Sequence, residues 1–222
     1  MEHMIHDHRL LDLVERLNFT QAIYYTWTGK FPTQEVEALF NACLVSLIDH
    51  GPETLSAKSA RVAASGGAET HAALAAGLLA AGKHHGSAPL QQATALFRKA
   101  VANKQSAADV VAQSLADGVR LPGYGHKVYT TDPRTVALLA KADKLKLTDD
   151  HVRMAVAMEA ELEKQKGKKL CLNVDGAIAA LLPAMGLSTE VAPGVFLVAR
   201  AVGLMMHINQ EQGEKPASQR KV

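Results

Sequence analysis

The sequence is poor in aromatic residues, and it shows almost none of the polar–apolar alternation that marks β-strands. Phe, Trp and Tyr together make up 5% of the 222 residues, and the apolar content is mostly Ala, Leu and Val. These residues suit close packing between helices better than the core of a β-sandwich. The composition therefore predicts an all-α fold, in a chain long enough for one domain or one domain with a small appendage.

A strong net charge and long apolar runs are also missing. The formal net charge is +2, which is too small to indicate nucleic acid as the main partner. The run from Ala72 to Gly82 is far shorter than the roughly 20 residues that cross a bilayer, and the N-terminus lacks the pattern of a signal peptide. Cys43 and Cys171 lie in separate apolar runs, which indicates buried free thiols and a reducing compartment. We therefore expect a cytoplasmic protein without a membrane partner.

Helical periodicity covers the chain from residue 33 onward, with Gly and Pro between the segments. The expected helices are 33–50, 56–65, 68–82, 87–104, 106–120, 132–143, 147–169, 173–185 and 189–212. No linker divides the chain clearly. A smaller lobe over 91–169, between two parts of a larger lobe at 1–90 and 170–222, is the predicted division.

The stretch LPGYGHKVYTTDPR, residues 121–134, is the most unusual part of the sequence. Its glycines allow a tight turn before His126, a residue that can donate or accept a proton at a ligand oxygen. Asp132 and Pro133 are typical of a helix start, so Arg134 falls in the first turn, where the helix dipole disfavours a cation. Either a bound anion or a nearby acid would resolve this conflict.

Arg200 interrupts the nearly continuous apolar segment PGVFLVARAVGLMMHI, and His207 lies two turns further along the same helix face. A guanidinium in such a place needs a partner, because an isolated buried charge is very costly. That partner is either a structural carboxylate or a carboxylate of the substrate.

Several polar residues stand at helix ends, where capping alone would explain them. His50 ends a helix in IDHGP, and GKHHG places His84 and His85 in a short break. Asp175 follows Asn173 at a helix start in LCLNVDGAIAALL, where it is either a cap or a carboxylate acid or base. The run KQKGKK at 164–169 is either a solvated helix end or a contact for phosphates. Histidines 3, 6 and 8 are not expected to form a metal site, because no rigid scaffold surrounds them.

The order of these motifs resembles the citrate synthase superfamily. DHGP, HHG, GYGHKVY followed by DPR, NVDG and an arginine in the last apolar helix occur in the order of that family, from about Leu17 to Gln212. IDHGPETLSAKSAR and LNVDGAIAALL resemble the citryl-CoA lyase module of ATP-citrate lyase more than they resemble ordinary citrate synthase. The chain is shorter than typical citrate synthases, so it resembles the small stand-alone citryl-CoA lyase-like members.

The resemblance implies an all-α fold with a large and a small lobe, an active site in the cleft between them, and a homodimer or higher even oligomer. It implies catalytic roles for His85, His126 and Asp175 at the thioester oxygen, the hydroxyl or carbonyl oxygen and the acetyl carbon, respectively. The implied dicarboxylate ligands are His50, Arg134 and Arg200. The implied CoA contacts are Gly123, Tyr124, Gly125, Lys127, Lys168 and Lys169.

The function that the resemblance implies is cleavage of citryl-CoA to acetyl-CoA and oxaloacetate, with the CoA thioester as substrate and no further cofactor. Condensation by a citrate or 2-methylcitrate synthase would use the same groups, and a non-catalytic CoA-binding subunit is the third alternative. Which of His84 and His85 meets the thioester stays open. Citrate synthases place an arginine near the C-terminus that reaches the neighbouring subunit, whereas this sequence offers Lys215 and Arg220. No ATP-grasp or phosphohistidine module is present, so ATP-driven cleavage by this chain alone is not expected.

Overall fold

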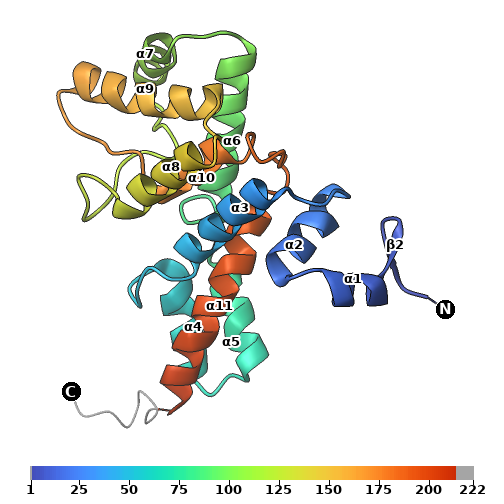
Figure 1. Ribbon diagram of the computed structural model, residues 1–222. Coiled ribbons are helices and arrows are strands. Elements are labelled where there is room, and N and C mark those ends of the chain that lie inside the picture. The colour runs from blue at the N-terminus through green and yellow to red at the C-terminus, as the bar shows by residue number, and fades with distance from the viewer. Residues whose placement is uncertain (1, 214–222) are drawn as a thin grey trace.

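The computed structural model describes residues 2–213, which form eleven helices and one short hairpin (Figure 1). The elements are β1 (Met4–Ile5), β2 (His8–Arg9), α1 (Leu10–Arg16), α2 (Phe19–Thr28), α3 (Gln34–Leu47), α4 (Leu55–Ser65), α5 (Thr70–Leu79), α6 (Ser87–Ala102), α7 (Ala107–Ala116), α8 (Pro133–Lys144), α9 (Asp150–Lys166), α10 (Val174–Leu181) and α11 (Ala192–Gly213). The predicted all-α class is therefore confirmed.

The nine expected helices all occur, as α3 to α11, and their boundaries follow from local capping. Asp149 accepts the backbone N–H groups of His151 and Val152, so α9 begins three residues later than expected. Gly118 adopts a left-handed conformation just after α7, which ends earlier than expected. The described residues do not test the predicted division into lobes at 91 and 169, and it stays a prediction.

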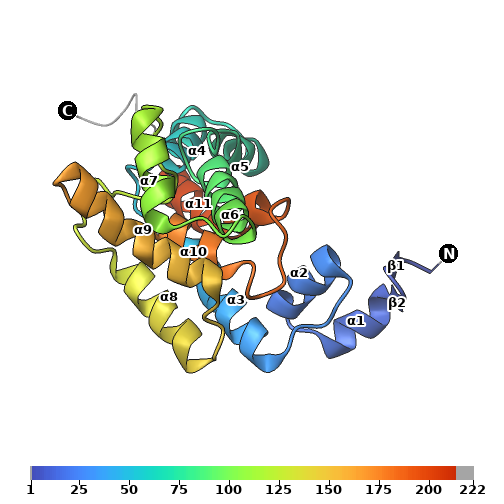
Figure 2. The ribbon, with the colours of Figure 1, turned by 90° about the horizontal axis from the view of Figure 1, so that it is seen from above.

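The segment before residue 30 was not predicted in detail. α2 packs on the main core through Ile23 and Tyr24, while the hairpin and α1 project beyond it (Figures 1 and 2). α2 begins with a capping box between Asn18 and Gln21. The N-terminal histidines are used for packing: His6 Nε2 contacts the carbonyl oxygen of Thr26, and His8 Nδ1 contacts the hydroxyl of Tyr25. Two of the three histidines in this segment therefore have structural partners.

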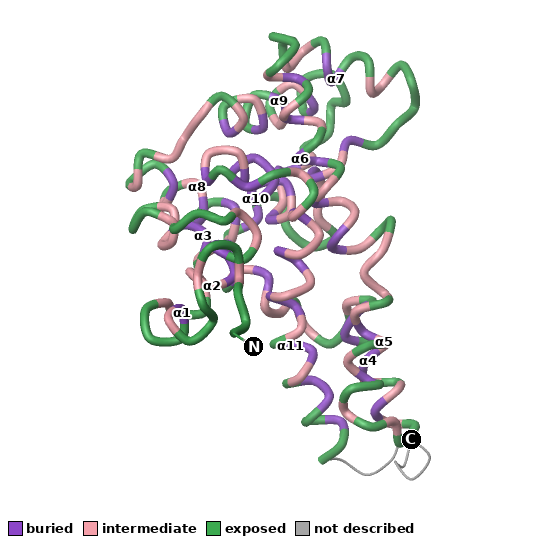
Figure 3. Tube along the Cα trace, turned by 90° about the vertical axis from the view of Figure 1, so that its right-hand side faces the viewer, coloured by how far each residue is buried: buried purple, intermediate pink, exposed green. Residues whose placement is uncertain are grey.

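The remaining helices form two groups, one above and one below α3 in Figure 1. In the lower group α4 and α5 pack against each other and on α11, with a small core of alanines, Leu204 and Ile208. In the upper group α10 packs against α6, α8 and α9, and nearly all of its residues are buried (Figure 3). α6 contacts both α11 and α9, so it connects the two groups.

α11 is long and apolar enough to cross a membrane by length and composition, but half of its most apolar window is buried inside the protein. It packs against α3, α4, α5 and α6, and it buries Arg200, His207 and Glu211. Such burial is typical of the central helix of a helical domain.

Candidate active site

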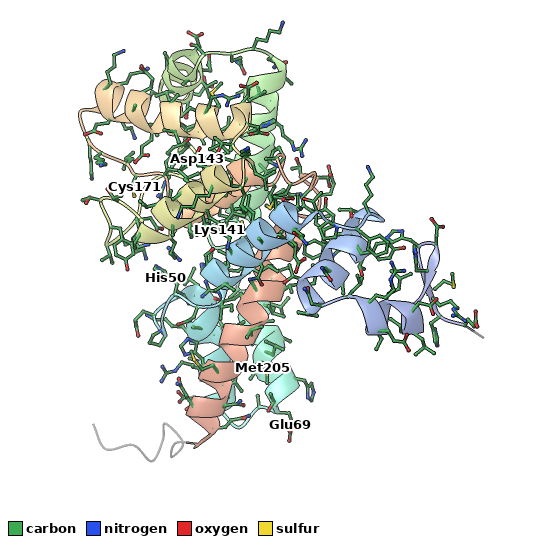
Figure 4. The ribbon with its side chains drawn as sticks, viewed as in Figure 1. His50, Glu69, Lys141, Asp143, Cys171 and Met205 are labelled. Carbon is green, nitrogen blue, oxygen red and sulfur yellow. The ribbon has the colours of Figure 1, made fainter. Side chains whose placement is uncertain are left out.

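Most of the predicted site residues come from the ends of helices that meet near the middle of the molecule. His50 follows α3, His85 precedes α6, Asp175 is in the first turn of α10, and Arg200 lies within α11. Figure 4 shows His50 at the junction between the upper and lower groups of helices. Because a helix end leaves backbone groups unpaired, these positions suit polar side chains and bound ligands.

His50 and His126 contact each other directly. Their Nε2 atoms lie 3.1 Å apart, although the residues are 76 positions apart in sequence. The Nδ1 atom of His126 accepts the backbone N–H groups of Val128 and Tyr129, each at 3.0 Å. His126 therefore carries its proton on Nε2 and donates it to His50 Nε2. Burial lowers the pKa of both histidines, Arg134 reinforces this, and Asp132 opposes it, so both rings are neutral at pH 7.

His85 rather than His84 faces this cluster. Its Nε2 atom accepts the backbone N–H of Ser56 at 3.3 Å and lies 2.9 Å from the Ser56 hydroxyl, while its ring stands edge-on to Phe196. Burial, followed by the charge of Arg200, lowers the pKa of His85 to about 4. Because Nε2 is an acceptor, the neutral ring carries its proton on Nδ1. His84 is exposed.

The glycine after this pair determines how His85 is placed. Gly86 adopts φ 71°, and a Cβ at that position would overlap the ring of Phe196. Only glycine combines this backbone conformation with so close an aromatic neighbour. The HHG motif therefore brings the chain tightly against α11 at the point where His85 turns inward.

Arg134 is paired with Asp132, so the nearby acid considered for it exists. Its Nε and Nη2 atoms donate to the two carboxylate oxygens at 3.1 and 2.8 Å. Asp132 is fully buried and also accepts the backbone N–H groups of Arg134 and Val174. Burial alone would raise the pKa of Asp132, but these hydrogen bonds hold it below its ordinary value. One carboxylate thus joins the starts of α8 and α10 and orients Arg134.

Arg200 has no comparable partner among residues 2–213. Its side chain is 3% exposed, and its Nε and Nη1 atoms are buried without a hydrogen-bond acceptor. The Asp49 carboxylate lies 4.0 Å from Nη1, and the guanidinium stacks over Phe196 at 5.1 Å from the ring centroid. A buried guanidinium with unsatisfied N–H groups is the expected state of an anion-binding arginine before its ligand arrives.

Asp175 sits where two backbones touch. A Cβ on Gly123 would lie 2.7 Å from the Cα of Gly176, and a Cβ on Gly176 would overlap the Gly123 carbonyl oxygen. This contact brings the 121–126 turn against the start of α10. Burial raises the pKa of Asp175 to about 6, while the nearby charges of Arg134 and Arg200 lower it. Asp175 therefore switches between acid and carboxylate close to neutral pH.

The residues predicted to contact CoA differ in how accessible they are to a ligand. Tyr124 is buried, with its hydroxyl donating to the carbonyl oxygen of Ala155, so only its backbone could reach a ligand. The backbone of the turn is paired with residues 171–173: Gly125 N–H donates to Cys171, and the Gly123 carbonyl oxygen accepts from Asn173. The predicted lysine contacts are exposed: Lys127, Lys168 and Lys169. Lys169 Nζ lies 3.4 Å from the Thr131 hydroxyl, so this lysine reaches the loop that carries His126.

Sequence reasoning missed three residues that hold the site residues in place. Ser56 fixes the tautomer of His85, and Asp49 lies beside Arg200 and His207. Asp132 was recognised only as a helix cap, although it also orients Arg134. Asp49 could have been noticed because it directly precedes His50, whereas Ser56 has no distinctive pattern around it.

Among the described residues no metal-binding group marks the cluster, and three hollows lie elsewhere on the molecule. Residues 2–213 contain no group of three His, Cys, Asp or Glu side chains placed to hold a metal ion. A hollow of about 260 Å³ lies beside α2, and two others of about 260 and 290 Å³ lie along α4 and the end of α11. None of these three hollows is lined by a predicted site residue. Lys215 and Arg220 lie outside the described residues.

Comparison with known proteins finds related sequences and structures. Residues 1–220 match the family model described as citrate synthase, C-terminal domain. The structure of citryl-CoA lyase from Hydrogenobacter thermophilus superposes with a TM-score of 0.93 at 42% identity, covering 100% of this chain and 87% of that one. A probable ATP-citrate synthase of Dictyostelium discoideum is 29% identical over 90% of this chain, which covers 35% of that protein.

A third similarity concerns the fold alone. The structure of ATP citrate lyase from Methanothrix soehngenii, in complex with citrate and coenzyme A, superposes with a TM-score of 0.84 at 24% identity. It covers 96% of this chain, which corresponds to 38% of that one. The chain spans about half or less of the length of the curated relatives that it matches.

Proposed function

The chain belongs to the citrate synthase family, and from this premise we propose that it cleaves citryl-CoA into acetyl-CoA and oxaloacetate. The observation that carries the proposal is the convergence of neutral His85 and His126, an Asp175 with a raised pKa, and an unsatisfied Arg200. These groups act on one another: Arg200 lowers the pKa of His85 and of Asp175, and His126 contacts His50. The likeness to citryl-CoA lyase of Hydrogenobacter thermophilus favours the lyase direction.

Cleavage places negative charge on the thioester oxygen as the acetyl-CoA enolate leaves. His85 supplies a neutral Nδ1–H donor there, because Ser56 occupies its Nε2 atom. A fixed donor of this kind contributes about 3–4 kcal/mol of transition-state stabilisation. Asp175 in its acid form protonates the enolate carbon, and its pKa of about 6 keeps part of the population protonated near neutral pH.

The citryl hydroxyl must lose its proton in the same step. The resemblance implies that His126 exchanges this proton, but its Nε2 atom already carries one in the free protein. His50 Nε2 is the accepting nitrogen of the pair. We therefore assign the proton exchange to the His50–His126 pair. In cleavage, His126 passes its Nε2 proton to His50 and takes the proton of the hydroxyl; in the reverse direction, His126 donates that proton to the carbonyl oxygen of oxaloacetate and takes one back from His50.

The carboxylates of the oxaloacetate part bind the two arginines. Arg200 offers the buried Nε and Nη1 atoms, while Arg134 keeps its Nη1 atom beyond the two that Asp132 occupies. Planar guanidinium groups suit this recognition because each presents several N–H groups in a fixed geometry. The exposed lysines 127, 168 and 169 would meet the CoA phosphates. The cleft between two lobes, an even oligomer and a cytoplasmic location remain part of this proposal.

Condensation of acetyl-CoA or propionyl-CoA with oxaloacetate is the alternative that the family match favours, because the same groups run in reverse. Supplying citryl-CoA and following acetyl-CoA by chromatography, with oxaloacetate coupled to malate dehydrogenase, tests the lyase. Supplying acetyl-CoA and oxaloacetate and following free thiol tests the synthase. Binding of CoA without turnover in either assay would leave a non-catalytic subunit as the function, and the lyase proposal would then be wrong.

A further inference from the structure

Asp49 has a position that the proposed chemistry does not explain. Its Oδ2 atom accepts the backbone N–H of Gly51 at 3.0 Å, and its Oδ1 atom accepts Nε2–H of His207 at 2.9 Å. The same Oδ1 atom lies 4.0 Å from Arg200 Nη1, too far for a hydrogen bond. Asp49 therefore faces the guanidinium as a counter-charge while both of its oxygens are bonded elsewhere.

The contrast with the other arginine shows how unusual this is. Asp132 takes two N–H groups of Arg134, although Arg134 is the more exposed of the two arginines. Arg200 is more deeply buried, yet it leaves Nε and Nη1 without an acceptor. A buried guanidinium with a carboxylate in reach would ordinarily form a close pair. Another interaction must therefore keep the Asp49 carboxylate from moving into hydrogen-bond distance of Arg200.

We propose that His207 is a positioning residue: it retains the Asp49 carboxylate so that the guanidinium of Arg200 stays free to bind a carboxylate of the substrate. The inference rests on the proposed function for the identity of that substrate. His207 is suited to this task because it is buried on the same face of α11 as Arg200, two turns away. Its hydrogen bond occupies the oxygen that would otherwise move toward Arg200.

The proposal predicts that loss of the His207 donor allows Asp49 to pair with Arg200. His207→Leu removes the N–H group but keeps an apolar side chain in the buried position. His207→Gln keeps a donor at nearly the place of Nε2. Adding Asp49→Asn to the leucine variant removes the competing carboxylate. Met205→Leu, on the same helix and labelled in Figure 4, controls for changes in packing.

Citrate and CoA binding measured by calorimetry give a readout that does not depend on turnover. We expect His207→Leu to weaken citrate binding about tenfold, the scale of one charge-assisted hydrogen bond, and to raise the KM for citryl-CoA with little change in kcat. His207→Gln and Met205→Leu should stay within about threefold of the wild type. The double variant should recover most of the lost affinity, and CoA affinity should be unchanged throughout.

The four possible outcomes distinguish the role of His207 from the proposed function. Recovery in the double variant supports a retained carboxylate, because a purely structural role would make the two substitutions add to each other. Equal citrate affinity of the wild type and His207→Leu would overturn the inference while leaving the lyase proposal intact. If the affinities are as expected but the wild type does not cleave citryl-CoA, the inference about His207 is supported and the proposed lyase activity is wrong. Failure of the wild type to bind citrate would overturn both.

Discussion

Replacing Asp175 by Asn tests two effects of this residue separately: how much it lowers the free energy of unfolding, and how much it accelerates the proposed reaction. The carboxyl group is at the start of α10, with the backbone contact between Gly123 and Gly176 beside it. Asn has nearly the same shape but cannot ionise. The substitution therefore removes the charged form while keeping the packing of the helix start.

The magnitude follows from the pKa of Asp175, which burial raises from 3.8 to about 6. The folded protein binds more protons than the unfolded chain between these values, so its stability falls as the pH rises through this window. About 2 pH units correspond to roughly 3 kcal/mol. Because the side chain is still partly accessible to solvent, we expect Asp175→Asn to be more stable by about 2 kcal/mol above pH 7, with little difference near pH 4.

Urea unfolding of the wild type and the variant at intervals between pH 4 and pH 8 measures this difference directly. Asp143→Asn is the matched control, because Asp143 is an exposed residue of α8 (Figure 4), and its effect should stay within about 0.5 kcal/mol. Cleavage of citryl-CoA by Asp175→Asn should fall about 10²–10⁴-fold, as for the loss of a general acid. A stability difference that does not change with pH would refute the reasoning.

Three further substitutions test other parts of the site. His85→Ala should lower kcat about 10²–10³-fold with CoA binding retained by calorimetry, and normal turnover would remove His85 from the reaction. Asp132→Ala should destabilise the protein by about 3–5 kcal/mol in urea unfolding, because it leaves the guanidinium of Arg134 without its buried partner; a loss below about 1 kcal/mol would contradict this. Gly176→Ala should cost about 1–3 kcal/mol in the same assay, because its Cβ overlaps the Gly123 carbonyl oxygen, and wild-type stability would mean that the two backbones separate freely.

The helices after residue 30 were predictable because their signals are local. Thr33, Ser106 and Asp132 cap α3, α7 and α8 as the sequence indicates, since each places an oxygen beside the first free N–H groups. The projecting N-terminal segment was not predictable in this way. α1 has seven residues and buries only Leu13, so its apolar pattern is too short to distinguish it from a loop.

The candidate site, like the fold, was predictable only in part from local sequence signals. The type and order of the polar residues indicated which side chains are candidates for the chemistry, but tautomers and pairings depend on neighbours that the sequence pattern does not identify. His126 Nδ1 is an acceptor because of two backbone N–H groups within its own turn, whereas His85 depends on Ser56, 29 positions away. Tyr124 shows another limit of sequence motifs. The motif predicts a CoA contact at Tyr124, but it does not show that the side chain is buried against Ala155 and that only the backbone could reach a ligand.

Arg200 and Asp175 together explain why the free protein tolerates an unfavourable arrangement. Each group carries a burial cost, and their opposite charges act on each other, yet no direct hydrogen bond joins them in the described structure. A direct pair would lower both costs, but it would also keep Asp175 ionised, so that it could not protonate carbon in the proposed reaction, and it would occupy the guanidinium proposed to hold a carboxylate. Keeping them apart leaves room for a ligand to meet both. If the proposed ligand binds both groups, its binding should raise the stability of the protein, because a ligand that binds only the folded state stabilises that state.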